Sequence, residues 1–211
     1  MNIEFKVERL QVSTCGLGSV NRQEIGAEVE EPSLIPDCKA FLQFVADYLA
    51  RENGIIKTGE TLAYGYWVTK FVGGANQSLI AWEYNSHATE FVPGISLTLR
   101  FWRSQHETCA KAGAEFCPPR PDLLAVVSDG VFEGDPVEGV RYPSPPHMSG
   151  WWFTTNRYNG DIKTLRCEHL YHLTAKRFEL SSYLALPFGY RFVTASNEVW
   201  FDEEVARSSL E

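Results

Sequence analysis

The alternation of apolar and polar positions predicts β-strands along much of the first half of the chain. Residues 3–12 alternate charged and apolar side chains, and aromatic or β-branched residues dominate residues 61–72, 78–84 and 95–101. A two-residue period of this kind is typical of strands with one buried face. A Gly-Gly-Ala-Asn sequence at residues 73–76 lies between two of these segments and predicts a hairpin loop.

A helical period is present at two places in the same half. Apolar residues recur every three or four positions over residues 41–49, and Asp37 can cap a helix that begins at Cys38 or Lys39. The strand predicted to end at residue 101 is expected to continue into a second helix over residues 102–115. The aromatic side chains of the first of these helices are expected to lie in the core.

A proline-rich segment separates the two halves of the chain. Cys117 is followed by Pro118-Pro119-Arg120-Pro121, which places three prolines within five residues. Prolines this dense make a rigid spacer that neither a helix nor a central strand can include. We therefore predict two domains, over residues 1–117 and 122–211.

The second half again mixes strand and helix signals. The fold class predicted for the whole chain is α+β, with mixed or antiparallel sheets, a few short helices and two subdomains. The segments expected in the second half are strands over residues 123–128 and 149–153, a helix in the later portion of 161–177, a short helix over 178–185, and a closing hairpin of 189–194 with 198–201.

The charge balance narrows the class of partner. The chain has 27 acidic and 19 basic residues, a formal net charge of −8. Residues 1–115 hold 14 acidic and 10 basic residues and residues 116–211 hold 13 and 9, so each part has a net charge of −4. A negative surface repels phosphate backbones, which argues against a nucleic-acid ligand. The same surface favours a basic partner through long-range attraction, although it also serves solubility.

Several classes of protein are disfavoured by what the sequence lacks. The charged N-terminus has no apolar core of a secretion signal, and no apolar run approaches the roughly 18 residues of a membrane span. The five cysteines include no Cys-x-x-Cys pair, which suits free thiols in a reducing cytoplasm. We expect a cytoplasmic protein with no membrane segment and no cofactor.

Two groups of residues could carry chemistry. His169 and His172 are three positions apart and could share a helical face, with Cys167 or Glu168 as a third metal ligand. A zinc hydrolase motif spaces its histidines four apart, so surface or backbone-bonded histidines are the simpler interpretation and no metal site is predicted. Ser128 follows an apolar strand and could be a nucleophile, but no base is near it in sequence and a turn explains it equally well.

Two adjacent tryptophans indicate an interface. Trp151 and Trp152 lie on one predicted strand, so their side chains point to opposite faces of the sheet. One of them can be buried in the core. The other requires a second layer, a loop or a partner, and tryptophan is enriched at binding hot spots.

The second half resembles a known family. The resemblance is carried by residues 127–129, by Val140-Arg141-Tyr142, by Ser149-Gly150-Trp151-Trp152-Phe153 and by the helix, proline, glycine and strand of residues 183–192. In their order and spacing these segments resemble the immunity-protein-33 family of bacterial toxin systems, over about residues 122–205. The first half resembles no family that we can name.

The resemblance implies a function without catalysis. An immunity protein binds its cognate toxin in the cytoplasm and blocks it, and many toxins are nucleases with a basic active-site cleft. We therefore predict a non-enzymatic toxin inhibitor, and two alternatives remain: a regulatory or adaptor module for another protein, and a small metal-dependent hydrolase. The predicted interface consists of four acidic residues with a tryptophan as apolar anchor: Asp129, Glu133, Asp135, Glu138, and Trp151 or Trp152.

Overall fold

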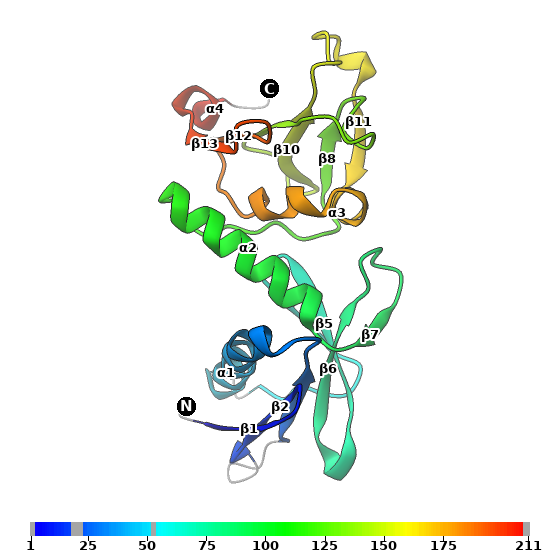
Figure 1. Cartoon of the computed structure of the whole chain (residues 1–211), viewed down its shortest axis with the longest axis vertical. Coiled ribbons are helices and arrows are strands. Elements are labelled where there is room, and N and C mark those ends of the chain that lie inside the picture. The colour runs from blue at the N-terminus through cyan, green and yellow to red at the C-terminus, as the bar shows by residue number, and fades with distance from the viewer. Residues whose placement is uncertain (1–2, 18–22, 52–53, 209–211) are drawn as a thin grey trace. The chain divides into compact units, whose positions relative to one another are not determined.

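The chain folds into two compact units, which are shown in Figure 1. The computed structural model describes residues 3–17, 23–51 and 54–208. Unit 1 comprises Met1–Arg103 and unit 2 comprises Ser104–Glu211. Helix α2 (Ser96–Ala112) crosses the boundary between the two units.

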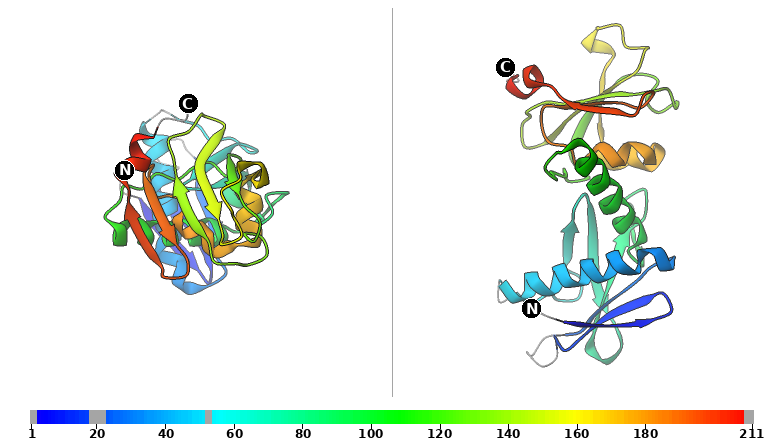
Figure 2. Two further views of the ribbon diagram at one scale, coloured as in Figure 1. Left: turned by 90° about the horizontal axis from the view of Figure 1, so that it is seen from above. Right: turned by 60° about the vertical axis from the view of Figure 1, so that its left-hand side comes forward.

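Unit 1 is built on a mixed sheet of seven strands. Their order is β1-β2-β3-β6-β5-β4, with β7 beside β6, and β3 pairs with β6 in parallel while the other pairs are antiparallel. The strands are β1 (Glu4–Glu8), β2 (Gln11–Cys15), β3 (Ile25–Glu28), β4 (Thr61–Tyr64), β5 (Trp67–Gly73), β6 (Leu79–Tyr84) and β7 (Phe91–Pro93). Helix α1 (Ile35–Arg51) packs on one face of this sheet, as the right-hand view of Figure 2 shows.

Helix α1 begins earlier than the sequence predicts. The 3-10 turn η2 (Pro32–Leu34) leads directly into Ile35, so Asp37 lies inside the first turn instead of capping a helix that starts at Cys38 or Lys39. Proline is tolerated in a first helical turn because the N–H group it lacks has no partner there. The carboxylate of Asp37 is instead paired with the guanidinium of Arg103.

Two predicted strands are hairpins in the structure. Residues 3–12 divide at Arg9, whose φ is 57°, into β1 and part of β2. Residues 61–72 divide at Gly65 and Tyr66 into β4 and β5. A two-residue turn adds no polar cluster to the sequence, so alternation alone does not reveal it. The predicted loop at residues 73–76 is confirmed: it joins β5 to β6 and includes the short turn η3 (Ala75–Gln77).

The strand predicted over residues 95–101 is wrong, because helix α2 starts at Ser96. Its β-branched and aromatic side chains favour a strand locally. In the fold, however, Glu83 on β6 accepts hydrogen bonds from the first backbone N–H groups of α2. Tertiary capping therefore overrides the local preference. Strand β3 was not predicted.

Unit 2 contains a second mixed sheet of six strands in the order β11-β8-β10-β9-β12-β13. Strands β8 and β10 are parallel and the other pairs are antiparallel. The strands are β8 (Leu124–Val127), β9 (Glu138–Arg141), β10 (Met148–Thr154), β11 (Arg166–His169), β12 (Tyr190–Val193) and β13 (Glu198–Phe201). The short helical elements are η4 (Ile162–Thr164), α3 (Leu170–Lys176), η5 (Phe178–Tyr183) and α4 (Glu203–Arg207).

One face of this second sheet is packed against η5 to form the core of unit 2. Trp151, Phe153 and Phe192 are fully buried on that face, and the ring of Tyr183 stacks on Phe192 with 3.9 Å between centroids. The predicted strands 123–128 and 149–153, the short helices and the closing hairpin are confirmed. Strands β9 and β11 were not predicted.

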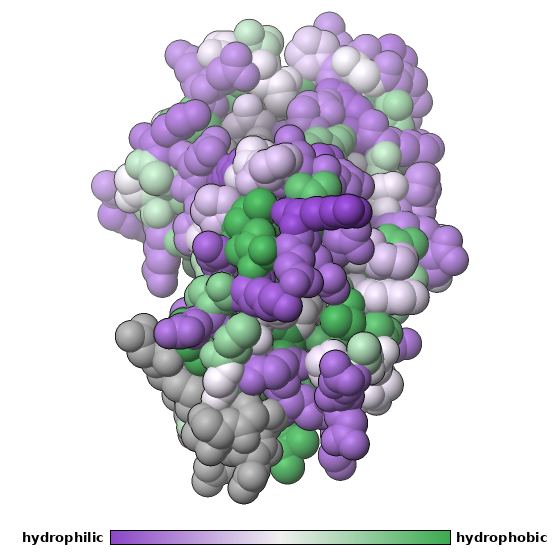
Figure 3. All heavy atoms as spheres, turned by 60° about the horizontal axis from the view of Figure 1, so that its bottom comes forward, coloured by the Kyte–Doolittle hydropathy of each residue, from purple (hydrophilic) through white to green (hydrophobic). Residues whose placement is uncertain are grey.

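The fold class is α+β, with mixed sheets and short helices in both units, as predicted. The compact units divide between Arg103 and Ser104, and the proline-rich segment at residues 117–121 lies within unit 2. The domain limits 1–117 and 122–211 remain a prediction about independent folding. Among the described residues, none of the helices has the length and apolar character needed to cross a bilayer. On the face shown in Figure 3, hydrophilic residues predominate and hydrophobic ones form small patches.

Candidate functional site

Arg141 lies in the core of unit 2 and organises it. This residue is on β9 and is only 3% exposed. Its Nε donates a hydrogen bond to the carbonyl of Ser149 at 3.1 Å. Its Nη1 donates to the carbonyls of Cys117, Leu184 and Leu186 at 2.7, 3.3 and 2.5 Å. One side chain thus joins the segment after α2, the start of β10 and the segment after η5.

The guanidinium of Arg141 is satisfied by main-chain oxygens and aromatic rings. Burial lowers its pKa to about 10, because the charged group loses its hydration. At neutral pH it therefore remains protonated. The rings of Trp151 and Phe188 lie 5.8 Å and 4.8 Å from the guanidinium carbon, where the faces of aromatic rings stabilise a cation.

Two glycines allow the backbone to close around Arg141. Gly150 has a φ of +81°, and a Cβ there would lie 2.2 Å from the carbonyl oxygen of Tyr142. Gly189 has a φ of +89° and donates its N–H to the carbonyl of Arg141 at 2.7 Å. Both positions require glycine for conformation and space. The segments that carry the family resemblance therefore converge on one structural framework.

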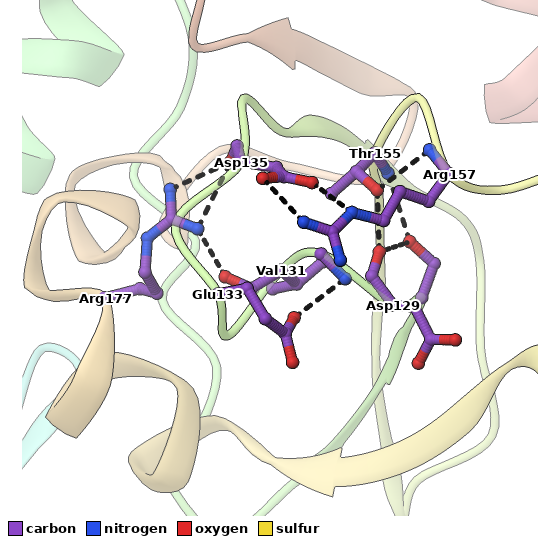
Figure 4. A network of polar contacts seen from close by, with 9 residues as sticks. Asp129, Val131, Glu133, Asp135, Thr155, Arg157 and Arg177 are labelled. Atoms are coloured by element: carbon purple, nitrogen blue, oxygen red, sulfur yellow. Dashed lines mark hydrogen bonds and ion pairs between the residues drawn. The ribbon is translucent and has the colours of Figure 1, made fainter.

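The acidic loop, residues 128–136, follows β8 and is held by a second buried arginine. Arg177 is 9% exposed and donates hydrogen bonds to the carbonyls of Val131 and Asp135, the latter at 3.2 Å (Figure 4). Inside the loop, the N–H of Asp135 donates to the carbonyl of Gly130 at 3.1 Å. These bonds fix the loop backbone, so its outward side chains have defined positions.

Arginines that are distant in sequence neutralise part of the acidic stretch. Asp135 is 2.6 Å from Nε of Arg157, and Glu138 is paired with Arg191. No base lies between residues 120 and 141 in sequence, yet the fold brings these arginines there from later in the chain. Asp135 and Glu138 are therefore members of ion pairs.

Asp129 and Glu133 carry the more exposed negative charge of the loop. The side chain of Asp129 is 69% exposed, with Nη1 of Arg166 at 3.7 Å. Glu133 is also exposed and accepts a hydrogen bond from the N–H of Gly130 at 2.8 Å. These two carboxylates can attract a basic partner more effectively than the paired ones.

The adjacent tryptophans point to opposite faces of the sheet, as predicted. Trp151 is fully buried, and its indole N–H donates to the carbonyl of Leu184 at 3.1 Å. Trp152 is partly exposed on the other face, where the ring of Tyr142 packs edge-on at 5.9 Å. Trp151 therefore belongs to the framework, and Trp152 is the member of the pair that a partner could reach.

We call the face that carries Trp152 the outer face of unit 2. Residues paired across neighbouring strands share a face, so the register defines one row across the sheet. From β11 to β13 the row is Cys167, Val126, Trp152, Val140, Arg191 and Trp200. The left-hand view of Figure 2 looks onto this face, with β9, β10, β12 and β13 toward the viewer.

The six predicted interface residues thus occupy three places. Asp129, Glu133 and Asp135 lie in the acidic loop, Glu138 and Trp152 lie on the outer face, and Trp151 lies in the core.

Ser128 and the histidine pair are engaged in structural contacts. Ser128 is 1% exposed; its hydroxyl donates to the carbonyl of Asp129 and accepts from the N–H of Thr155. Nδ1 of His169 is 2.8 Å from the carbonyl oxygen of Asp122, and His172 lies 3.4 Å from Glu168.

The two histidines do not share a helical face, because His169 ends β11 and precedes α3. Within residues 3–17, 23–51 and 54–208, the structure brings together no group of three or more potential metal ligands.

This geometry defines the class of protein to which unit 2 belongs. It is an α+β domain with a framework around Arg141 and one sheet face directed away from its core. Residues 104–202 match the family described as Imm33-like domain, which supports the resemblance to the immunity-protein-33 family predicted from the sequence. No curated protein and no solved structure gives a significant match to the chain.

The family match begins at Ser104, where unit 2 begins, whereas the sequence resemblance was placed from about residue 122. The second half of α2 explains the extension. Gln105 donates to the carbonyl of Ser181 at 3.0 Å, and Cys109 on the same helix is buried. The N–H of Cys117 donates to the carbonyl of Ala185 at 2.8 Å. The helix end is therefore part of the framework of this unit.

Sequence reasoning found the segment around Arg141 only through the resemblance. It assigned no role to Arg141 or to Arg177. The sequence does contain one local indication of a buried arginine. Arg141 stands alone between a valine and an aromatic residue in a strand-like segment. Its carbonyl partners come from residues 117 to 186, however, and no local pattern contains them.

Proposed function

We propose that unit 2 neutralises a protein toxin by binding to it. The observation that carries the proposal is that residues 104–202 match the Imm33-like domain family. The framework around Arg141 supports it, because the residues that carry the family resemblance hold the fold together and leave the surface available for recognition. On this proposal the protein acts as an inhibitor and not as an enzyme.

The charge of the protein indicates the kind of toxin. The net charge of −8, and the exposed carboxylates of Asp129 and Glu133, favour a toxin with a basic active-site cleft. Opposite potentials accelerate encounter and select the partner. In the proposed complex Asp129 and Glu133 border the cleft, Asp135 and Glu138 add to the negative potential, and Trp152 supplies an apolar contact.

Co-expression tests the proposal. The genes beside this one are searched for a toxin domain, which is then expressed in bacterial cells with and without the full chain, and growth is recorded. We expect the chain to restore growth, and to give no protection from an unrelated toxin, which serves as the specificity control. Unrestored growth in cells that contain folded protein would contradict the proposal. A stoichiometric complex with a different protein would then favour the adaptor alternative.

A further inference from the structure

The outer face of unit 2 carries more apolar side chains than a solvated sheet face is expected to have. A sheet covered on one side only normally alternates apolar residues toward the core with polar residues toward water. Here the strand register places six apolar side chains among the polar ones at the outward positions. They are Leu124, Val126, Val140, Trp152, Val193 and Trp200.

Two tryptophans dominate this face. Trp152 on β10 and Trp200 on β13 stand in the same cross-strand row, separated by Val140 and Arg191. Trp200 is 38% exposed and Trp152 is partly exposed. Val126 and Val140 in the same row are only 7% exposed, so the two tryptophans are the apolar groups of this row that a partner could reach. Tryptophan is enriched at interface hot spots.

The charges on this face are predominantly negative. Arg191 is its one basic strand residue, and it is paired with both Glu138 and Asp202 while its guanidinium carbon lies 5.6 Å from the ring of Trp200. Glu198 lies at a further outward position on β13. Three carboxylates and one guanidinium give this half of the face a formal charge of −2.

We propose that the outer face, from Trp152 to Trp200, is the surface that docks the toxin. This inference rests on the proposed function and adds the site and the chemistry of the partner surface. That surface has an apolar centre that covers the two tryptophans, and lysine or arginine side chains that reach Glu138, Glu198 and Asp202. The acidic loop then contributes mainly to electrostatic attraction.

Charge argues against a second copy of this chain as the occupant. Two outer faces in contact would bring the carboxylates of Glu138, Glu198 and Asp202 against the same groups of the other copy. A basic protein surface removes this repulsion, because each carboxylate then meets a cation.

Calorimetric titration of the purified full chain with the toxin domain that the gene search and growth assay identify tests the docking face. The variants are Trp200→Thr and Trp152→Thr, since threonine suits an outward strand position. Phe178→Thr is the matched control, because Phe178 is an exposed aromatic on η5 and not on the outer face. We expect each tryptophan variant to bind about 30-fold more weakly, the effect of losing a hot-spot aromatic, and the control to bind like the wild type.

A second variant protects the test against misfolding. Thr154→Arg adds bulk and positive charge at an outward position of β10 and leaves both tryptophans in place. We expect it to weaken binding while circular dichroism and the unfolding midpoint stay unchanged. Binding within twofold of wild type for all three outer-face variants would overturn the docking face.

The outcomes separate the inference from the function on which it rests. If the wild type does not bind the toxin domain, the proposed function fails. If the wild type binds and the tryptophan variants bind equally well, only the docking face is overturned. If sedimentation shows a dimer that Trp200→Thr dissociates, the face belongs to a second copy and the inference is also overturned.

Discussion

Each unit contains a buried charged side chain that main-chain groups stabilise, Glu83 in unit 1 and Arg141 in unit 2. In unit 1, Glu83 is 6% exposed, and its carboxylate accepts hydrogen bonds from the N–H groups of Leu97 and Thr98 at the start of α2, at 3.0 and 2.6 Å. In unit 2, the guanidinium of Arg141 donates to four backbone carbonyls. A helix start offers N–H donors to an anion. Backbone carbonyls, three of them outside the helices and strands, offer acceptors to a cation.

Main-chain groups stabilise both buried charges, but the two side chains differ in whether they titrate near neutral pH. Burial raises the pKa of Glu83 to about 7, although the hydrogen bonds from Thr98 and Leu97 act in the opposite direction. Burial lowers the pKa of Arg141 only to about 10. Glu83 therefore titrates in the physiological range and Arg141 does not, so Glu83 is expected to make the stability of unit 1 depend on pH there, whereas Arg141 adds no such dependence to unit 2.

Removing the buried cation should have the largest effect on stability. Arg141→Met leaves several buried carbonyls without a donor, and each unpaired group costs about 1 kcal/mol or more. We expect the free energy of unfolding of unit 2 to fall by about 3 kcal/mol, measured by urea denaturation of the full chain and by hydrogen exchange in β9 and β10. Arg120→Met, at an exposed arginine, is the control and should leave the midpoint unchanged. Equal midpoints for the two variants would show that Arg141 is not the framework residue.

The buried anion should make the stability of unit 1 depend on pH. The folded pKa of Glu83, about 7, lies above its ordinary value of 4.5, so the folded state binds more protons between these pH values. The free energy of unfolding should therefore decrease as pH rises from 4.5 to 7, by roughly 3 kcal/mol for this group.

Glu83→Gln should remove this dependence, and hydrogen exchange in β6 at pH 5 and pH 7.5 measures it. Glu90→Gln, at an exposed glutamate, should retain it. A wild-type unit 1 whose stability is constant over this range would contradict the assignment.

A substitution at Gly150, where β9 and β10 approach closely beside Arg141, should lower stability by a smaller amount. Gly150→Ala places a Cβ against the carbonyl of Tyr142 and requires a left-handed backbone, so we expect a loss of at least about 1 kcal/mol in thermal unfolding. Gly160 has a similar φ of +90°, with no atom within 4 Å of the added Cβ. Gly160→Ala therefore isolates the conformational part, and an equal loss in both variants would exclude a steric role for Gly150.

Charge reversal at the exposed acidic residues should change stability least, and it should slow association with the toxin. Asp129→Lys with Glu133→Lys should leave the unfolding midpoint close to wild type, because both side chains are exposed. Association with the toxin domain should slow by roughly tenfold at low salt, as expected when electrostatic attraction is reversed. Stopped-flow kinetics measures this rate, and the Asp129→Asn and Glu133→Gln pair should be intermediate. A change confined to the dissociation rate would contradict a role in attraction.

The sequence predicted the elements whose signals are local. The hairpin loop at residues 73–76 and the closing hairpin around residues 195–197 were correct because their turn residues are contiguous. The strand predicted over residues 95–101 failed because the helix depends on a cap from Glu83, which lies more than ten residues away. Turns at Arg9 and Gly65 were missed because they leave the alternation intact.

The candidate site was less predictable than the fold. Alternation alone placed Trp151 and Trp152 on opposite faces, and the structure shows which is buried. The acidic residues 129–138 were predicted to form one negatively charged interface. Two of them are neutralised by Arg157 and Arg191, which lie outside this stretch in sequence. Ion pairs between distant segments depend on the fold, so a count of local charges cannot include them.

The most direct measurement is the stoichiometry and affinity of the complex between the full chain and the toxin domain that the gene search and growth assay identify. If unit 2 is an inhibitor that docks through its outer face, calorimetry should give a tight one-to-one complex for wild type that weakens when Trp200 is replaced. Absence of binding by folded wild-type protein would contradict toxin neutralisation by this domain.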